Sequence, residues 1–181
     1  PFATDIPATA PIVSFGSERY VSPATSGTVA FDYSNNNGRF TFGAGDMAFS
    51  PDGQSLAFSS PGHISRVQLG GGAPQTVWSS GLSGDALNGL TWSADGTLAF
   101  AFQNGINVLR PGAVTATPLK SPGGLYVGLP HFLPDGQSLL YYKAQTATPD
   151  SHVVVWQPLS GGEPVELIKG SAPQFVPPDR L

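Results

Sequence analysis

The chain has 181 residues and a net charge of −4, and its three lysines and five arginines stand singly along the sequence. No stripe of positive charge is therefore present to neutralise phosphates, which excludes nucleic acid as an expected partner. No apolar run approaches the roughly 18 residues of a membrane-spanning helix, and the absence of cysteine excludes disulfides and thiolate metal sites.

Charged residues make up 11% of the chain, against roughly 25% in an ordinary soluble protein, whereas glycine (23) and proline (18) are frequent. Short strands joined by many tight turns give this balance. The 40% of apolar residues argue against disorder. Low charge with few lysines favours an extracellular, periplasmic or cell-surface location.

The N-terminal part predicts an extended lead-in followed by strands. Residues 1–11 are rich in proline, alanine and threonine, which is typical of a linker. Strands are expected at 12–15, 27–33 and 39–42. The last two flank the sequence Asn-Asn-Asn-Gly, which indicates a hairpin because both residue types tolerate positive φ. Residues 12–44 are therefore interpreted as an incomplete sheet.

A strand–turn–strand phrase recurs from residue 49 onward, at 49–58, 92–100 and 132–141. Each copy has an aromatic residue three positions before an Asp-Gly pair, and the successive aspartates lie 43 and 40 residues apart. Repeats of this length are typical of propellers and other repeat architectures. A weaker echo of the phrase stands at residues 175–179.

In each copy the Asp-Gly pair is expected to close a tight hairpin. The aspartate side chain accepts hydrogen bonds from nearby backbone amides, and the glycine takes the left-handed conformation that the loop needs. This structural role explains the three carboxylates better than a shared active site, because a repeat spreads them apart in space. The expected turn residues are Asp52, Gly53, Asp95, Gly96, Asp135 and Gly136.

Three units of four antiparallel strands follow from the repeat, at residues 45–87, 88–127 and 128–171. Residues 172–181 are expected to start a further or closing unit. No stretch has a capped helical period, so the chain is predicted to be all-β. The expected strands lie near 45–50, 54–59, 63–69 and 75–78, then 88–93, 97–102, 105–110 and 114–119, then 128–133, 137–143, 152–159 and 164–168.

The repeated phrases resemble the propeller repeat of TolB and its bacterial relatives, a cousin of the WD repeat, whose units carry Phe-Ser-Pro-Asp-Gly. Residues 49–58 match closely, residues 132–141 have Leu133 in place of the serine, and residues 92–100 have Ala94 in place of the proline. The resemblance covers about residues 45–179. It implies a ring of four-stranded blades around a central channel, typically six or seven of them.

Three arrangements of the blades remain open at this point. In the first, strands at 12–15, 27–33 and 39–42 combine with residues 172–176 into a fourth blade and close a small ring. In the second, the chain is a segment of a larger propeller. In the third, it is an open half that associates with another chain, a homo-oligomer through open blade edges, because unpaired strand edges invite pairing.

The sequence indicates no catalytic centre, no metal site and no cofactor. The three histidines, at positions 63, 131 and 152, lack the spacing of a metal motif. The Gly-x-Ser-x-Gly phrase of serine hydrolases is missing. The run Gly70-Gly71-Gly72 precedes a strand and no helix, so it is not expected to bind phosphate. We therefore expect a protein that is not an enzyme.

Three connections, at 79–87, 120–127 and 144–151, are longer than a turn requires and are expected on one face of the propeller. Repeat scaffolds place recognition on such loops, and aromatic side chains with a few polar groups suit binding. Solvated loops or packing between blades is the alternative for any single residue. The candidate ligand-binding residues are Trp78, Asp85, Asn88, Tyr126, His131 and Asp150.

These features favour a non-enzymatic scaffold that recognises a protein or a small ligand at the loop face or at the mouth of the channel. One alternative is a structural surface protein that associates with itself. The other is a sensor propeller within a larger enzyme, since the middle stretch also resembles propellers on the extracellular portions of bacterial receptor-type kinases. Prolyl-oligopeptidase-like hydrolases carry related propellers as well.

Overall fold

The computed structural model describes residues 12–15, 18–21, 30–32, 47–60, 62–82, 87–173 and 175. Within them every regular element is a strand, apart from one short 3-10 helix, η1 (Pro149–Ser151). The strands β1 (Ile12–Phe15), β2 (Glu18–Val21) and β3 (Ala30–Asp32) form a three-stranded antiparallel sheet. The remaining strands form three sheets of four strands each.

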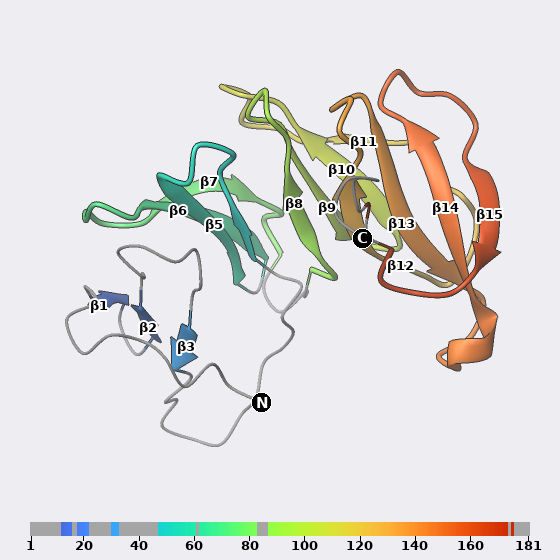
Figure 1. Ribbon diagram of the computed structural model, residues 1–181, viewed down its shortest axis with the longest axis horizontal. Helices are drawn as coiled ribbons and strands as arrows, with labels where there is room; N and C mark the ends of the chain where they lie inside the picture. The colour runs from blue at the N-terminus through green and yellow to red at the C-terminus, as the bar shows by residue number, and fades with distance from the viewer. Residues whose placement is uncertain are drawn as a thin grey trace.

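Each four-stranded sheet is an antiparallel meander, and we call the sheets blades 1, 2 and 3 in chain order (Figure 1). Blade 1 consists of β4 (Met47–Phe49), β5 (Ser55–Ser60), β6 (His63–Gln68) and β7 (Gln75–Ser79). Blade 2 consists of β8 (Leu90–Trp92), β9 (Leu98–Phe102), β10 (Gly105–Leu109) and β11 (Thr117–Pro118). Blade 3 consists of β12 (Tyr126–Phe132), β13 (Ser138–Ala144), β14 (His152–Pro158) and β15 (Val165–Lys169).

The all-β propeller expectation is confirmed, and the three described blades make up a partial propeller. Figure 1 shows the three blades side by side. The first strand β8 contacts both β4 and β12. The first strands of neighbouring blades therefore contact one another, as they would at the inner side of a ring of blades.

The Asp-Gly turns of the three blades share the same aspartate hydrogen bond, although the turn of blade 2 is one residue shorter than the other two. The amides of Gln54, Thr97 and Gln137 each donate to the aspartate two residues earlier, at 2.9 Å in every case. The glycine at the centre of each turn has a positive φ, between 62° and 89°. Because these contacts are local, the repeated phrase is sufficient to build them.

Hydrogen bonding lowers the pKa of all three turn aspartates below the ordinary value of 3.8. For Asp95 the largest cause is the Ser93 hydroxyl, followed by the Thr97 amide. A carboxyl whose pKa is lowered by folding stabilises the native state above its unfolded pKa. It loses that contribution as the pH falls through the folded pKa.

We therefore expect Asp95→Asn to lower the free energy of unfolding at pH 7 by about 1 kcal/mol, since a hydrogen bond to a charged group is lost from a largely exposed turn. The difference from wild type should begin to shrink as the pH falls below about 4, where the carboxyl of the unfolded chain takes up a proton, and should vanish below the lowered pKa of the folded state. Urea unfolding at pH 7 and pH 3 measures both effects. A difference that stays constant between these pH values would contradict this account.

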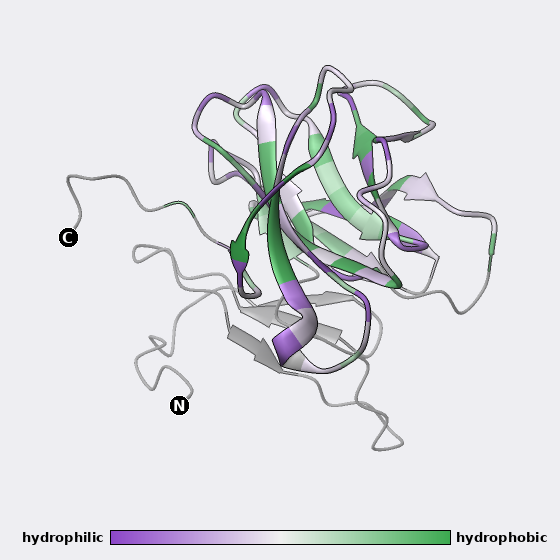
Figure 2. Cartoon of the chain, turned by 90° about the vertical axis from the view of Figure 1, so that its right-hand side faces the viewer, coloured by the Kyte–Doolittle hydropathy of each residue, from purple (hydrophilic) through white to green (hydrophobic). Residues whose placement is uncertain are grey.

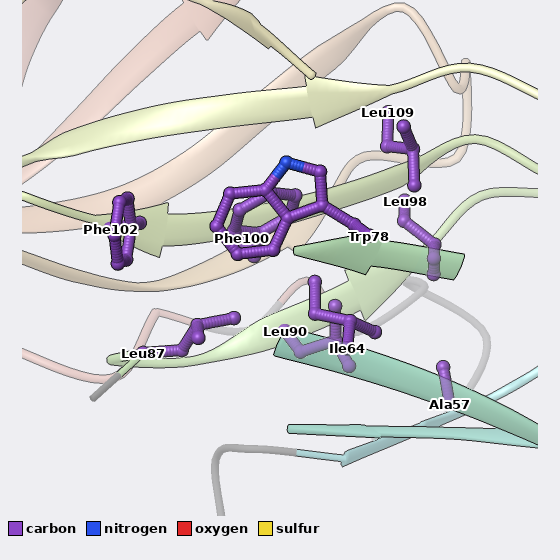
Figure 3. Packing of buried hydrophobic residues seen from close by; sticks show 9 residues of the cluster. All are labelled: Ala57, Ile64, Trp78, Leu87, Leu90, Leu98, Phe100, Phe102 and Leu109. Atoms are coloured by element: carbon purple, nitrogen blue, oxygen red, sulfur yellow. The ribbon is translucent and has the colours of Figure 1, made fainter. Parts of the chain in front are cut away.

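The two contacts between blades combine small side chains from one sheet with large side chains from the next. Ala57 and Ile64 of blade 1 pack against Leu98 and Phe100 of blade 2, and Trp78 closes the same cluster (Figure 3). Between blades 2 and 3, side chains of β9 and β10 meet side chains of β12, β13 and β14. The buried members there are Ala99, Ala101, Ile106, Val127, Phe132, Leu139, Tyr141 and Val155.

The first sheet and the C-terminal segment differ from expectation. Strand β2 was not predicted, β3 falls within the expected 27–33, of which only residues 30–32 are described, and the expected strand at 39–42 lies outside the described residues. The described residues 172, 173 and 175 are not in a strand, so no pairing with β1–β3 is seen for them. Strand β11 is also shorter than the expected 114–119, because the chain is held in a turn from Arg110 to Ala113 and joins the β10 ladder only at Thr117.

Candidate functional site

The inner strand of blade 3 contains a β-bulge that is held by blade 2. The pairing of β12 with β13 shifts register between Gly128 and His131, and Leu129 has a φ of 50°. Positive φ is uncommon for a residue with a branched, bulky side chain. The Leu129 amide donates to the Asn88 carbonyl oxygen at 2.8 Å, across the contact between the blades. Bulges of this kind re-aim side chains and are frequent beside functional sites.

Asn88 holds the bulge through its side chain as well. Its amide nitrogen Nδ2 donates to the Val127 carbonyl oxygen at 3.2 Å and to the Tyr142 hydroxyl at 2.7 Å. A Cβ at Gly128 would lie 2.2 Å from this nitrogen, so a residue without a side chain is required there. Asn88 thus connects the start of blade 2 to the inner edge of blade 3.

Tyr142, which accepts a hydrogen bond from Asn88, also contacts the ring of His152. The ring of Tyr142 stacks on that of His152 with centroids 4.8 Å apart and an interplanar angle of 17°. The Nδ1 atom of His152 is buried and has no hydrogen-bond partner among the described residues. Buried polar atoms in proteins normally have a hydrogen-bond partner. The unpaired Nδ1 atom therefore makes His152 a candidate for contact with a ligand.

Exposed apolar side chains flank these polar groups where blade 3 begins. Leu125 and Tyr126 are 59% and 45% exposed. Tyr126 lies opposite Ala144, which in turn pairs with His152. The Leu125 amide donates to the Ala144 carbonyl oxygen at 2.9 Å, which holds this segment in place. We call Asn88, Leu125, Tyr126, Tyr142 and His152 the rim.

The loop before the rim is fastened to blade 3 by polar contacts. The Lys143 ammonium donates to the Pro122 carbonyl oxygen at 2.9 Å and pairs with Glu166 at 2.6 Å. Lys120 pairs with Glu163, and the Gln157 side-chain amide donates to the Lys120 carbonyl oxygen at 3.0 Å. These hydrogen bonds and ion pairs hold the segment that precedes Leu125 against blade 3.

The structure brings together two of the six candidate binding residues, Asn88 and Tyr126, at the rim. His131 lies further along β12, opposite Leu140, and burial lowers the pKa of its imidazole, which favours the neutral form. Trp78 is 8% exposed and its ring lies 4.6 Å from that of Phe100, inside the contact between blades 1 and 2.

The two remaining candidates are acidic. Asp150 is exposed, in η1, within the connection between β13 and β14. Asp85 lies outside the described residues. Sequence reasoning missed Tyr142 and His152 as site residues. Their only signal was aromatic side chains near the ends of two paired strands, and the stacking depends on the strand register.

Acidic and imidazole side chains do not gather in the described part of the chain. No group of three or more His, Asp or Glu residues that could hold a metal ion is found there. Among the same residues, no helix is long and apolar enough to cross a membrane. The rim itself offers amide, hydroxyl and imidazole groups for hydrogen bonds beside an apolar surface, a combination that suits recognition of a ligand.

Comparison with known proteins gives similarity in fold at low sequence identity. No protein-family model matches the sequence, and the search of curated proteins gives no match. TolB from Acinetobacter baumannii is 18% identical with a TM-score of 0.60, over 84% of this chain and 38% of that one. A TolB-type protein from Agrobacterium tumefaciens is 19% identical with a TM-score of 0.60, over 88% of this chain and 61% of that one.

A nidogen/laminin complex is also similar, at 17% identity and a TM-score of 0.55, over 69% of this chain and 49% of that one. The chain thus spans between 38% and 61% of the length of these three structures. The similarity confirms the resemblance of the repeats to TolB at the level of fold. The described part of the chain has the fold of a TolB-like β-propeller, of which it forms three blades.

Proposed function

We propose that this protein is a non-enzymatic recognition module that binds a protein segment at the rim. The observation that carries the proposal is the position of Leu125 and Tyr126. Both are large side chains that are about half exposed, Asn88 donates to the carbonyl oxygen of the neighbouring residue Val127, and Tyr126 lies in the same row of the sheet as His152, with Ala144 between them. Exposed aromatic anchors next to polar groups are the usual composition of binding hot spots.

The rigidity of the support favours binding at this place. Tyr126 belongs to β12, which pairs with β13, and β13 in turn pairs with β14 over seven residues. The loop before Tyr126 is held to the same sheet by the hydrogen bond from Lys143 to the Pro122 carbonyl oxygen. A side chain that is already held in place loses little conformational freedom when a ligand binds, and more of the contact energy then appears as affinity. The nidogen/laminin structure adds that a protein with a similar fold occurs in a complex of two proteins.

The rim can be tested with peptides selected against the protein. A phage library of random linear peptides is selected on the wild-type chain, and the affinities of the selected peptides are measured by calorimetry for two variants. We expect Tyr126→Ala to weaken binding about tenfold or more, since a buried aromatic anchor is worth at least about 1.4 kcal/mol. Val114→Ala, at an 85% exposed position in blade 2, serves as the matched control and should leave affinity unchanged.

Peptides that bind wild type and Tyr126→Ala equally well would contradict the proposal. So would a selection whose peptides all lose affinity on Val114→Ala. Tyr126 is partly exposed and not a member of the buried clusters, so its replacement by alanine is expected to leave the fold intact.

A further inference from the structure

An arginine interrupts the apolar contact between blades 1 and 2. Arg66 lies opposite Ala57 in the ladder of β5 and β6, on the side of the sheet that faces blade 2. By register, the equivalent residues are Val108 in blade 2 and Trp156 in blade 3. Figure 2, which views the molecule from the side of blade 3, shows apolar residues in green on the strands seen there. An apolar residue is thus sufficient at this position for the fold of a blade, and the charge of Arg66 is not required by the repeat.

A second departure from the repeat meets the first across the contact between the blades. Trp92 of β8 takes the aromatic position before the Asp-Gly turn, where blades 1 and 3 have Phe49 and Phe132. The guanidinium carbon of Arg66 lies 5.4 Å from the centroid of the Trp92 ring. The indole Nε1 atom is buried and has no hydrogen-bond partner among the described residues. Since phenylalanine has no such donor, the indole N–H is also not required by the repeat.

The guanidinium is fixed in place and still has donors to spare. Its Nε and Nη2 atoms donate to the hydroxyl of Ser55, which is fully buried, at 3.1 and 2.9 Å. With its amide oriented to satisfy both neighbours, the Gln68 side-chain oxygen accepts from Nη2 at 3.2 Å. A guanidinium carries five N–H donors in a rigid plane. The two N–H groups of Nη1 therefore have no acceptor in the described part of the chain.

The positive charge of Arg66 is also without a close counter-charge. Arg66 is only partly exposed, and no carboxylate of the described residues lies within ion-pair distance of it. The pKa of Asp52 is lowered mainly by the Ser50 hydroxyl and the Gln54 amide, and to a smaller extent by the charge of Arg66. Charges that are withdrawn from water are normally paired. This cluster therefore offers charge and donors to an anion.

We propose that Arg66, held by Ser55 and by the ring of Trp92, binds the carboxylate group of a small ligand through Nη1. The indole covers one face of the guanidinium and leaves its edge for the anion, where charge-assisted hydrogen bonds are strongest. The two sides of the site, β6 and β8, belong to neighbouring blades of the described structure. The proposal does not depend on binding at the rim.

The surrounding charge favours a singly charged carboxylate over a phosphate dianion. Asp52 is close enough to sense Arg66, and the chain as a whole has a net charge of −4. Repulsion from these charges grows with the charge of the ligand. Because a lone carboxylate makes few contacts, we expect a dissociation constant on the order of 10 mM for acetate.

The indole N–H of Trp92 provides a direct measurement of binding. Sodium acetate is titrated into the ¹⁵N-labelled 181-residue chain at pH 7, with sodium chloride replaced so that ionic strength stays constant. The resonance of Trp92 is identified among those of the three tryptophans by its loss in Trp92→Phe. We expect it to shift and saturate with acetate, and inorganic phosphate should bind more weakly.

Two variants separate the site from a general effect of salt. Arg66→Met should weaken acetate binding at least tenfold, and it should fold because the other blades have apolar residues at this position. Arg110→Met is the matched control. Arg110 is an exposed arginine that acts on the turn aspartate Asp95 as Arg66 acts on Asp52, and its loss should leave acetate binding unchanged.

A Trp92 resonance that does not saturate up to about thirty times the expected dissociation constant would overturn the proposal. Equal acetate affinity of wild type and Arg66→Met would also overturn it, as would tighter binding of phosphate than of acetate. If Arg66→Met fails to fold, Arg66→Gln, which keeps a hydrogen-bonding side chain beside Ser55, should show the same tenfold loss. Tyr126→Ala should bind acetate as wild type does, which separates this site from the rim.

Discussion

Replacing Trp78 by alanine is expected to lower the free energy of unfolding by about 3–5 kcal/mol, the usual cost of removing a buried Trp side chain. The indole is 8% exposed and packs against Phe100 and Phe102, with ring centroids 4.6 and 5.2 Å away. These three rings belong to two different blades (Figure 3). The cavity would therefore open between the blades, where neither sheet can close it alone. Guanidinium unfolding followed by circular dichroism measures the loss.

The conservative variant Trp78→Phe keeps an aromatic ring at the contact and should cost less than half as much as the alanine variant. Wild-type stability in Trp78→Ala would contradict the position of this residue between the blades. The same variant bears on Trp78 as a candidate for ligand binding. If Trp78→Ala weakens peptide binding at the rim only as far as it increases the unfolded fraction, the weaker binding results from unfolding. Trp78 itself then makes no contact with the peptide.

Replacing Gly89 by alanine is expected to destabilise the protein by about 3 kcal/mol, for two additive reasons. Gly89 has a φ of +102°, a conformation that alanine avoids. A Cβ there would also lie 2.7 Å from the Cα and 2.8 Å from the amide nitrogen of Leu129. Both neighbours are backbone atoms of the bulge, so they cannot turn aside as a flexible side chain would. The β12 bulge would have to move.

Gly112→Ala provides the matched control for this effect. Gly112 also has a positive φ, of 77°, but a Cβ there would meet nothing within 4 Å. Only the backbone strain applies, and the expected cost is about 1 kcal/mol. Thermal and urea unfolding of both variants measure the difference. Equal costs would show that the approach of Gly89 to Leu129 is not a structural requirement.

The strands and turns of the blades could be predicted because their causes are local. Asp52, Asp95 and Asp135 bond amides two residues away, and the glycine that follows each supplies the positive φ. The period of the repeat then placed four strands in each unit. The predicted bounds are least accurate at β11, where the turn from Arg110 to Ala113 delays the start of the strand to Thr117.

The candidate site was predicted in part. Asn88 and Tyr126 stand next to long connections, and loops are where repeat proteins bind, so both were found from sequence. Tyr142 and His152 were missed because their stacking depends on which residues face one another across β13 and β14. Trp78 shows the opposite difficulty. An aromatic residue beside a loop has the same appearance in sequence whether it faces solvent or the neighbouring blade.

The sequence by itself determined the repeat, the all-β class and the position of each turn, because hydrogen bonds between residues two to five apart are sufficient to specify them. Only the tertiary structure decided which faces are covered, that Asn88 reaches across to Tyr142, and that Leu129 adopts a positive φ beside Gly89. These features arise from contacts between residues about 40 or more positions apart. Their geometry depends on how one blade lies against the next, which no local pattern records.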